Sequence, residues 1–281
     1  MGLMLPFGHI NAANLAGAWE ESVRWTWENG VRIATQYDRP GDPLSRDCSM
    51  TISVEDPFAE PRGHLAMPGG FYDLEIYRQE VVDGIHDRWI NPEEGKWQYT
   101  YHERLAAYTV PGLRQPIDQL QYVVDTLSKV PHSRRAQAVL WKAWDDAGID
   151  HPACLQRLWF RILPDPDTAD IERLVVSAYM RSNDAFKAAY MNMFVFTDLQ
   201  RSIAERISEQ SGRMVIPGQY NHIVDSFHIY GSYFADFEGF LKSVETRTWE
   251  QRTWRTEDVQ IYFDEAREKI SLNLAKQNEG S

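Results

Sequence analysis

The stretch from residue 131 to residue 230 constrains this chain more than any other part, because predicted strands and short polar motifs alternate within it. Apolar runs predict strands over residues 136–144 and 155–163, on either side of Cys154, and over residues 174–179 and 222–230. A long, mostly apolar run predicts a helix over residues 192–210. The polar motifs therefore stand beside several of the predicted strands.

The rest of the chain predicts further helices and one variable segment. Apolar residues at helical spacing predict helices over residues 13–36, 116–129, 233–244 and 264–281, with Pro116 at a first helical position, where its missing N–H costs nothing. Turn residues fill 38–43, and a short strand is expected over 50–54. The repeated Arg-Thr-Trp at 247–249 and 252–254 is interpreted as strand alternation. No internal repeat or linker is visible, so residues 1–281 are expected to form a single domain in which 45–91 is a divergent segment.

Composition limits the classes of partner. At 281 residues and 32.6 kDa the chain can bury a substantial core. Its net charge of −12 argues against nucleic acid and anionic membranes as partners, although a few local arginines can still bind an anionic mononucleotide. No apolar run approaches the roughly 20 residues that span a bilayer, and the start lacks the basic region of a signal peptide. Two cysteines, Cys48 and Cys154, make no disulfide framework, so reduced thiols and a cytoplasmic location are expected.

Cys154 is the candidate nucleophile. A lone cysteine between strands is more often a buried, inert apolar residue. A cysteine acts as a nucleophile in its thiolate form, which nearby cations stabilise. The candidate cations are Arg181, Arg134 and Arg135. The cysteine alone leaves both interpretations open.

The arginines are candidate phosphate ligands. Planar guanidinium groups bind phosphate through two parallel hydrogen bonds, which lysine cannot reproduce. Arg134 and Arg135 enter a predicted strand rather than the solvated end of a helix, where adjacent arginines are usually found. Arg39, in a turn, is by itself an ordinary loop charge.

Four polar residues could recognise the rest of a nucleotide. Asp184 and Asn192 could simply cap a helix, but an amide also offers a donor and an acceptor that match a pyrimidine edge. His228 and Tyr230 alternate on a predicted strand and therefore point to the same side, either into a core or towards a ribose hydroxyl. The sequence contains no histidine or cysteine spacing typical of a metal site, no Walker loop and no GxGxxG.

Taken in order, these motifs resemble the thymidylate synthase family. The segments that carry the resemblance are Pro131-His132-Ser133-Arg134-Arg135, Trp141, Pro152-Ala153-Cys154, Arg181-Ser182-Asn183-Asp184, Asn192 and His228-Ile229-Tyr230. Asp38-Arg39-Pro40-Gly41 resembles the family's N-terminal phosphate loop, and Tyr99-Thr100-Tyr101 resembles a tyrosine segment seen especially in archaeal members. The resemblance covers residues 39–230; it is good over 119–230 and poor over 45–91.

The resemblance implies an α/β (α+β) fold, in which a large mixed sheet packs against helices on one face and against its twin in a homodimer on the other. It implies that Cys154 attacks C6 of a pyrimidine nucleoside monophosphate, so that C5 becomes a carbon nucleophile. C5 then takes a one-carbon unit from the cofactor 5,10-methylenetetrahydrofolate.

The resemblance also implies roles for the other motif residues. Arg39, Arg181 and Ser182 would hold the phosphate, while Arg134 and Arg135 would reach it from the other subunit. Asn192 would bind the base, and His228 and Tyr230 the sugar 3′-hydroxyl. Asp184 would serve the folate and proton transfer, and Tyr101 the ordered water that removes the C5 proton.

Several positions depart from the family pattern. Ala153 separates the proline from Cys154, Leu155 replaces a usual histidine, and His102 replaces a usual glycine. Lys-Ala-Ala-Tyr at 187–190 stands where a Leu-Gly-x-Pro turn is usual, and Glu75 and Glu80 are the candidates for the family's active-site glutamate. The apolar C-terminal tail that closes over the folate is not visible in the sequence.

Three functions therefore remain. Methylation of dUMP to dTMP is the leading one. The first alternative is 5-hydroxymethylation of dUMP, dCMP or CMP, which the absent closing tail favours, because excluding solvent protects reactive intermediates. The second is an inactive nucleotide-binding scaffold, against which the retained cysteine and arginines argue. The base, the sugar and the final product stay open, although Asn192 favours uracil.

Overall fold

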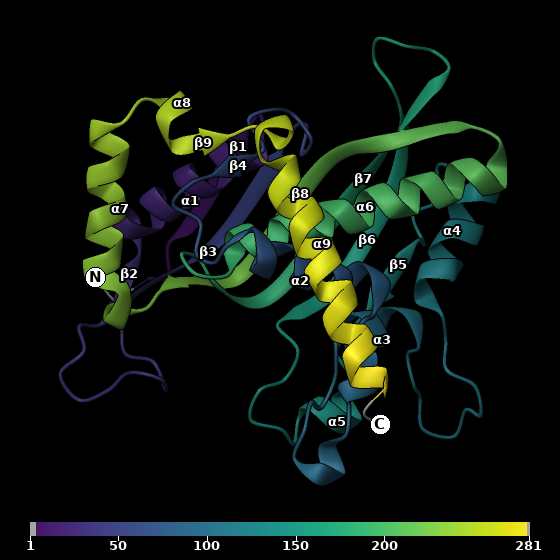
Figure 1. Cartoon of the computed structure of the whole chain (residues 1–281), viewed down its shortest axis with the longest axis horizontal. Coiled ribbons are helices and arrows are strands. Elements are labelled where there is room, and N and C mark those ends of the chain that lie inside the picture. Colours follow the sequence, from purple (N-terminus) through teal and green to yellow (C-terminus); the bar gives the residue numbers. More distant parts are fainter. Residues whose placement is uncertain (1–3, 280–281) are drawn as a thin grey trace.

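The computed structural model describes residues 4–279 and is built around a seven-stranded mixed sheet with the order β1-β3-β8-β7-β6-β5, in which β2 pairs with β3 (Figure 1). The strands of this sheet are β1 (Phe7–Ala12), β2 (Val31–Ile33), β3 (Ser45–Val54), β5 (Gln137–Val139), β6 (Leu155–Pro164), β7 (Ile171–Asp184) and β8 (Met214–Ile229). A second, two-stranded sheet pairs β4 (Gly63–His64) with β9 (Thr253–Trp254).

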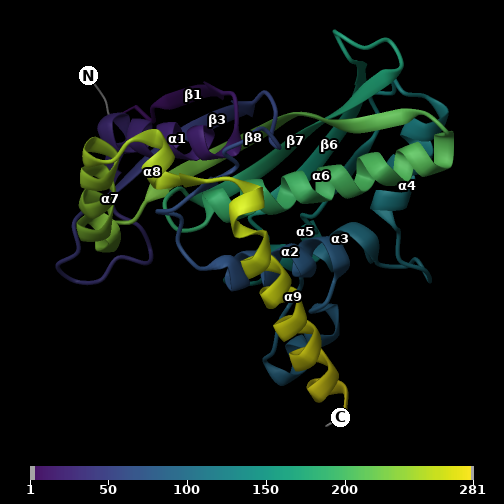
Figure 2. The same cartoon turned by 45° about the horizontal axis from the view of Figure 1, so that its top comes forward.

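Helices of very different lengths connect and cover the strands. The α-helices are α1 (Leu15–Asn29), α2 (Phe71–Asp83), α3 (Tyr101–Ala106), α4 (Gln119–Lys129), α5 (Ala143–Asp146), α6 (Ala189–Ser211), α7 (Phe234–Thr246), α8 (Trp249–Arg252) and α9 (Thr256–Glu279). Three short 3₁₀ turns are η1 (Asp87–Trp89), η2 (Pro92–Glu94) and η3 (Gly231–Tyr233). Helices α6, α2 and α9 lie on the same side of the large sheet (Figure 2).

The core lies between helix α6 and the two central strands. Strands β7 and β8 run parallel, and α6, which connects them, packs back against both. Phe196, Ile203 and Ile207 of α6 are almost fully buried, as are Ala178 and Val224 of the strands. Each large apolar side chain buried in this way stabilises the fold by about 1.5–3 kcal/mol. The predicted mixed sheet with helices on one face is confirmed.

The first helix is shorter than predicted. Helix α1 ends at Asn29, because Gly30 has an extended backbone and only its N–H bonds back, to the Thr26 carbonyl. A Cβ at Gly30 would lie 2.5 Å from that carbonyl oxygen, so a larger residue would not fit. The next residues pair with β3 as strand β2. Strand pairing therefore overrides a helical spacing that continues to residue 36 in the sequence.

The helix predicted over 116–129 begins three residues late. Asp118 caps α4 by accepting from the Gln121 N–H, and Pro116 lies before the cap. Ile117 is exposed and bonds to Tyr108 across an isolated bridge, so it does not join the buried face of the helix. The apolar residues on the inner face of this helix, Leu120, Val123, Val124 and Leu127, are all buried.

The strand predicted over 136–144 is also shorter. Strand β5 ends at Val139, and residues 143–146 form the single turn α5. The carboxylate of Asp146 accepts two hydrogen bonds from the Arg104 guanidinium, both of 2.9 Å, and one from the Lys142 backbone N–H, and this buried pairing turns the chain away from the sheet. By contrast, the predictions of strands over 155–163, 174–179 and 222–230 fall within β6 and β7 and largely within β8.

The C-terminal part corrects two expectations. The Arg-Thr-Trp repeat forms the turn α8 and the short strand β9, because Thr248 and Gln251 cap α8 reciprocally. Helix α9 begins at Thr256, earlier than predicted, and packs along α2; residues 280–281 of the predicted helix lie outside the described residues. The divergent segment contains β3, β4 and α2, which are integral to the sheets and the helical layer.

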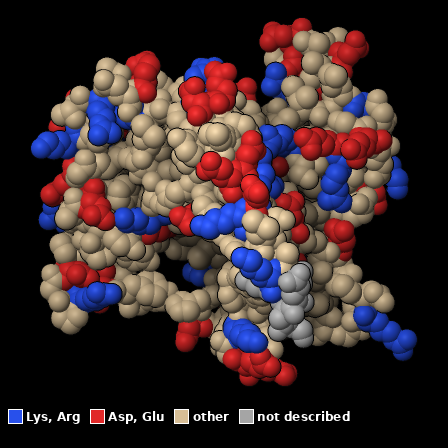
Figure 3. Space-filling model, in the orientation of Figure 1, with Lys and Arg blue, Asp and Glu red and all other residues tan. Residues whose placement is uncertain are grey.

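Charged side chains of both signs are interspersed over the face shown in Figure 3. Across residues 4–279, none of the helices combines the length and the apolar character needed to cross a bilayer.

Candidate active site

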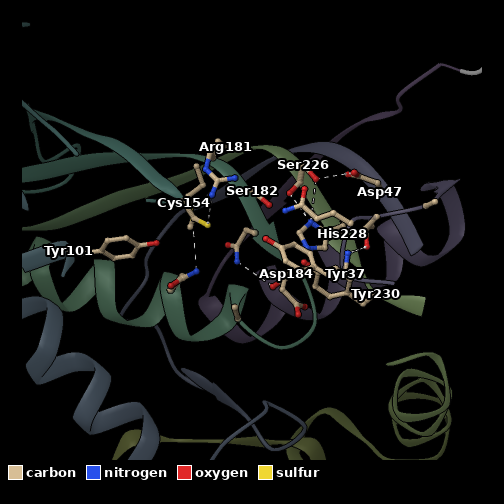
Figure 4. A pocket seen from close by; sticks show the side chains of 17 residues that line it. Tyr37, Asp47, Tyr101, Cys154, Arg181, Ser182, Asp184, Ser226, His228 and Tyr230 are labelled. Carbon is tan, nitrogen blue, oxygen red and sulfur yellow. Dashed lines mark hydrogen bonds between the residues drawn. The ribbon is translucent and has the colours of Figure 1, made fainter. Parts of the chain in front are cut away.

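A cavity of about 620 Å³ opens where strands β7 and β8 end and helix α6 begins (Figure 4). The structure brings together at this cavity the candidate residues Tyr101, Cys154, Arg181, Ser182, Asp184, Asn192, His228 and Tyr230. Because β7 and β8 are parallel, their carboxyl ends meet, and ligand sites of α/β sheets commonly lie at such ends.

The register of the sheet fixes which of these residues are neighbours. Ser182 of β7 pairs with Ser226 of β8, and Asp184 pairs with His228. Asp47 of β3 pairs with His228 from the other side. A row of polar residues therefore crosses three strands at one end of the cavity.

Cys154 is held directly against a guanidinium group. The Arg181 side chain donates to the carbonyls of Pro152 (2.7 Å) and Ala153 (3.1 Å), and its Nη2 lies 3.7 Å from the Cys154 sulfur. Burial raises the pKa of the Cys154 thiol, and the Arg181 charge opposes that rise. Arg181 therefore clamps the cysteine loop and stabilises a thiolate in the same position.

A buried phenol lies beside the cysteine loop. The Tyr101 hydroxyl accepts from the Leu155 N–H at 3.3 Å, one residue after Cys154. Burial raises the pKa of Tyr101 well above its usual value, so this phenol stays protonated and can still donate its own hydrogen.

The amide of Asn192 is oriented by two neighbours. The Tyr77 hydroxyl donates to Asn192 Oδ1 at 2.7 Å, and Asn192 Nδ2 faces the Met180 sulfur at 3.9 Å. A thioether sulfur can only accept, so the nitrogen belongs on its side. Burial raises the pKa of Tyr77 well above its usual value, so the phenol keeps the hydrogen that it donates. Asn192 is only 7% exposed, and the order of its donor and acceptor is fixed before any ligand binds.

Asp184 closes the turn between β7 and α6. Its Oδ1 accepts from the N–H groups of Phe186 (3.0 Å) and Lys187 (2.8 Å). Burial raises the pKa of this carboxyl group, while those N–H groups and the positive charge nearby oppose the rise. Its second oxygen is available to a ligand that carries N–H groups.

Three candidate arginines lie outside the cavity. Arg39 lines an adjoining cavity of about 470 Å³ next to Tyr37 and Tyr230, and its loop is exposed. Arg134 and Arg135 are exposed just before β5 and do not line the main cavity of this chain.

The two glutamates considered for the active site also lie elsewhere on helix α2. Glu75 accepts from the guanidinium groups of Arg78 and Arg267, and Glu80 bonds to His86 at 2.9 Å. Neither carboxylate lines the main cavity. The α2 residue that reaches the site is a tyrosine, through its bond to Asn192.

Asp47, Ser226 and Tyr77 were missed by the sequence reasoning. The strand predicted over 50–54 began too late to include Asp47, although the buried and half-buried residues of β3 alternate from Cys48 to Val54. Extending that alternation backwards would have placed Asp47 on a strand. Tyr77 carried no such signal, because nothing in the sequence shows which α2 residue faces Asn192.

Comparisons with known proteins agree on one family. The family model of thymidylate synthase matches residues 72–275. Curated relatives named "Putative thymidylate synthase" include one from Methanocaldococcus jannaschii, 30% identical over 226 residues that cover 79% of this chain and 90% of the relative. Another, from Methanosarcina mazei, is 26% identical over 237 residues that cover 84% of this chain and 95% of the relative.

A solved structure gives the same fold. The thermostable thymidylate synthase A from Bacillus subtilis superposes with a TM-score of 0.58 and 17% identity, covering 82% of this chain and 84% of that one. At this identity the likeness concerns the fold.

Proposed function

Because this chain belongs to the thymidylate synthase family, we propose that it transfers a one-carbon unit to C5 of a pyrimidine nucleoside monophosphate, with methylation of dUMP to dTMP as the leading reaction. The observation that carries the proposal is the position of Cys154. Its sulfur lies 3.7 Å from Arg181 Nη2, in the cavity that also holds the amide of Asn192 and the ring of His228. Residues 1–281 would act as a single domain.

The cysteine would begin the reaction. The Cys154 thiolate adds to C6 of the pyrimidine, and the electron pair of the C5–C6 double bond moves towards C5 and the O4 carbonyl. The positive charge of Arg181 favours the thiolate before attack. After C5 has bonded to the methylene group, loss of the C5 proton and cleavage of the bond to the folate nitrogen would leave an exocyclic methylene group on C5. Hydride from the tetrahydrofolate so released would reduce this group to methyl, and expulsion of the Cys154 thiolate would restore the C5–C6 double bond. Tyr101, whose hydroxyl accepts from the Leu155 N–H beside the cysteine, would orient the water that removes the C5 proton.

The one-carbon unit would come from 5,10-methylenetetrahydrofolate, which supplies an electrophilic methylene group. Asp184 fits a pterin, because its carboxylate lines the cavity with one oxygen held by backbone N–H groups and the other available to ring N–H donors. Asp184 would bind and orient this group.

The phosphate would be held by cations from two chains. Arg181 and Ser182 line the cavity, and Arg39 lies on the adjoining loop. Arg134 and Arg135 are exposed, which suits arginines that reach the phosphate of a second copy in a homodimer. The uncovered face of the sheet would form that dimer.

Asn192 would discriminate between the two bases, and the base that it matches is proposed to be uracil. Uracil presents an acceptor at O4 and a donor at N3, whereas cytosine presents the opposite order. Since Tyr77 and Met180 fix the amide with oxygen on one side and nitrogen on the other, only one of these orders is matched without a flip. A flip would place the amide oxygen against the Met180 sulfur, which has no hydrogen to donate.

Hydroxymethylation is the alternative, and helix α9 is the observation that favours it. In that reaction water, rather than hydride, adds to the exocyclic methylene group on C5. The described C-terminal residues continue as a helix along α2, and no residue of α9 lines the main cavity. A cavity that none of the described residues of α9 covers admits water.

The mass of the product separates these reactions. The protein is incubated with 5,10-methylenetetrahydrofolate and each of dUMP, dCMP, UMP and CMP, and the nucleotides are analysed by mass spectrometry. A methyl or a hydroxymethyl group on a uracil nucleotide supports one-carbon transfer and identifies its form. If the nucleotides bind but no product forms, the protein is an inactive nucleotide-binding scaffold and the proposal is wrong.

A further inference from the structure

Two strands carry a hydrogen-bonded chain of polar groups at the end of the cavity remote from Cys154 (Figure 4). Asp47 of β3 and His228 of β8 are paired across the sheet, and Ser226 lies two residues before His228. All three line the main cavity. The proposed function assigns His228 to the sugar, but gives Asp47 no task.

The hydrogen bonds of this chain determine which ring nitrogen of His228 carries a hydrogen. The Ser226 hydroxyl donates to Asp47 Oδ2 at 2.9 Å. Because a hydroxyl has one hydrogen, Ser226 Oγ can only accept from His228 Nδ1, which lies 3.3 Å away. The Ser226 carbonyl, 3.2 Å from Nδ1, is an acceptor too. In the singly protonated ring, Nδ1 therefore carries the hydrogen and Nε2 is an acceptor.

Two buried acceptors on this pair of residues have no hydrogen-bond partner among the described residues. His228 Nε2 and Asp47 Oδ1 are both inaccessible to solvent and make no hydrogen bond, and His228 is only 5% exposed. Leaving such a group unsatisfied costs about 1–3 kcal/mol. Burial raises the pKa of the Asp47 carboxyl, as expected where Ser226 is its one side-chain donor. The arrangement suits a ligand that brings two hydrogen-bond donors.

A ribose carries two such donors side by side. Its 2′- and 3′-hydroxyl groups are cis on the ring, and each can donate one hydrogen. A deoxyribose has only the 3′-hydroxyl, which would satisfy one of the two acceptors and leave the other buried and unpaired. Sites built to bond a hydroxyl reject analogues that lack it far more strongly than apolar pockets reject a missing methylene.

We propose that Asp47 accepts the 2′-hydroxyl of a ribonucleotide while His228 accepts the 3′-hydroxyl, so that the site takes UMP and prefers it to dUMP. This rests on the proposed function, because that function places the sugar at His228. The carboxylate gives the stronger of the two bonds, since a hydrogen bond to a charged acceptor is about twice as strong as one between neutral groups. The reaction at C5 is unchanged, and UMP takes the place of dUMP as the leading substrate.

The test compares UMP with dUMP in the wild-type protein and in two variants of Asp47. Steady-state kcat/KM for each nucleotide is measured with 5,10-methylenetetrahydrofolate, and binding of each nucleotide is measured by calorimetry. The wild type should prefer UMP by about tenfold or more, the loss expected for one hydrogen bond to a charged group. Asp47→Ala should lower kcat/KM for UMP about tenfold further than for dUMP. If the alanine variant does not fold, Asp47→Asn, which keeps an acceptor for Ser226, takes its place. It should also lower kcat/KM more for UMP than for dUMP.

A matched control lies on the same strand. Ser49 is outside the cavity and its hydroxyl bonds the Asp225 carbonyl at 2.8 Å, so Ser49→Ala should keep the wild-type UMP-to-dUMP ratio. Equal use of UMP and dUMP by the wild type would overturn the inference. So would an Asp47 variant that loses both nucleotides equally, because Asp47 would then only support Ser226. If neither nucleotide is turned over, the proposed function fails. Calorimetry then still tests the inference, because it shows whether the site binds UMP more tightly than dUMP.

Discussion

Replacing Tyr77 by phenylalanine should reduce the preference for uracil over cytosine nucleotides. The substitution keeps the ring and its packing and removes only the hydroxyl that donates to Asn192 Oδ1. Without that donor, the amide of Asn192 can flip and meet cytosine with its oxygen and nitrogen exchanged.

The size of the effect follows from one buried hydrogen bond. A bond of this kind contributes about 0.5–1.5 kcal/mol, and the 2.7 Å separation indicates a well-formed one. The Met180 contact, at 3.9 Å from a sulfur, is weak and remains in the variant. The ratio of kcat/KM for UMP over CMP, and for dUMP over dCMP, should therefore fall about 2- to 13-fold.

The assay is steady-state kinetics with all four nucleotides on the wild type, Tyr77→Phe and a control. Tyr99→Phe is the matched control, because the Tyr99 hydroxyl bonds the His151 carbonyl and Tyr99 does not line the main cavity. The control should keep the wild-type ratios. An unchanged ratio in Tyr77→Phe would refute the orienting role. An equal loss of kcat/KM for uracil and cytosine nucleotides would indicate that Tyr77 acts in a step that does not depend on the base.

Three further predictions concern the thiol, the dimer and the base. In Arg181→Leu, the pH midpoint for alkylation of Cys154 by iodoacetamide should rise, because the cation that opposes the effect of burial on the thiol pKa is gone; an unchanged midpoint would contradict this. Mixing Cys154→Ala chains with Arg135→Ala chains should restore activity through one intact hybrid site, and proven heterodimers without activity would count against shared sites. Asn192→Asp should shift kcat/KM towards cytosine nucleotides by about 1–3 kcal/mol, because a protonated carboxyl can donate to N3 and accept from N4; a wild type that already prefers cytosine would defeat the uracil assignment.

The sequence predicts the part of the site in which motifs and strand ends coincide. Cys154 lies just before a strand that is predicted by the apolar run following it. Asp184 and His228 lie at the ends of two other strands. Once those strands are predicted, their alignment places the polar residues at one end of a sheet. The pairing order of the strands is not contained in the local pattern, and the family resemblance implied only that the sheet is large and mixed.

The remaining parts depend on contacts between distant residues. Gly30 ends the first helix because the following residues pair with β3, which the helical spacing cannot reveal. Tyr77 becomes a site residue only because α2 packs against α6, more than a hundred positions away in sequence. Asp47 could have been found from the alternation of its strand, but its role depends on β8 lying beside β3.

Tritium release from C5-labelled nucleotide tests the central claim, covalent transfer through Cys154, most directly. The wild type should release tritium from 5-tritiated UMP or dUMP in the presence of 5,10-methylenetetrahydrofolate. Cys154→Ser should release none above background while binding the nucleotide within about an order of magnitude of the wild type, because the substitution leaves the side chains proposed to bind the phosphate, the base and the sugar in place. Release from the serine variant at the wild-type rate would contradict the account.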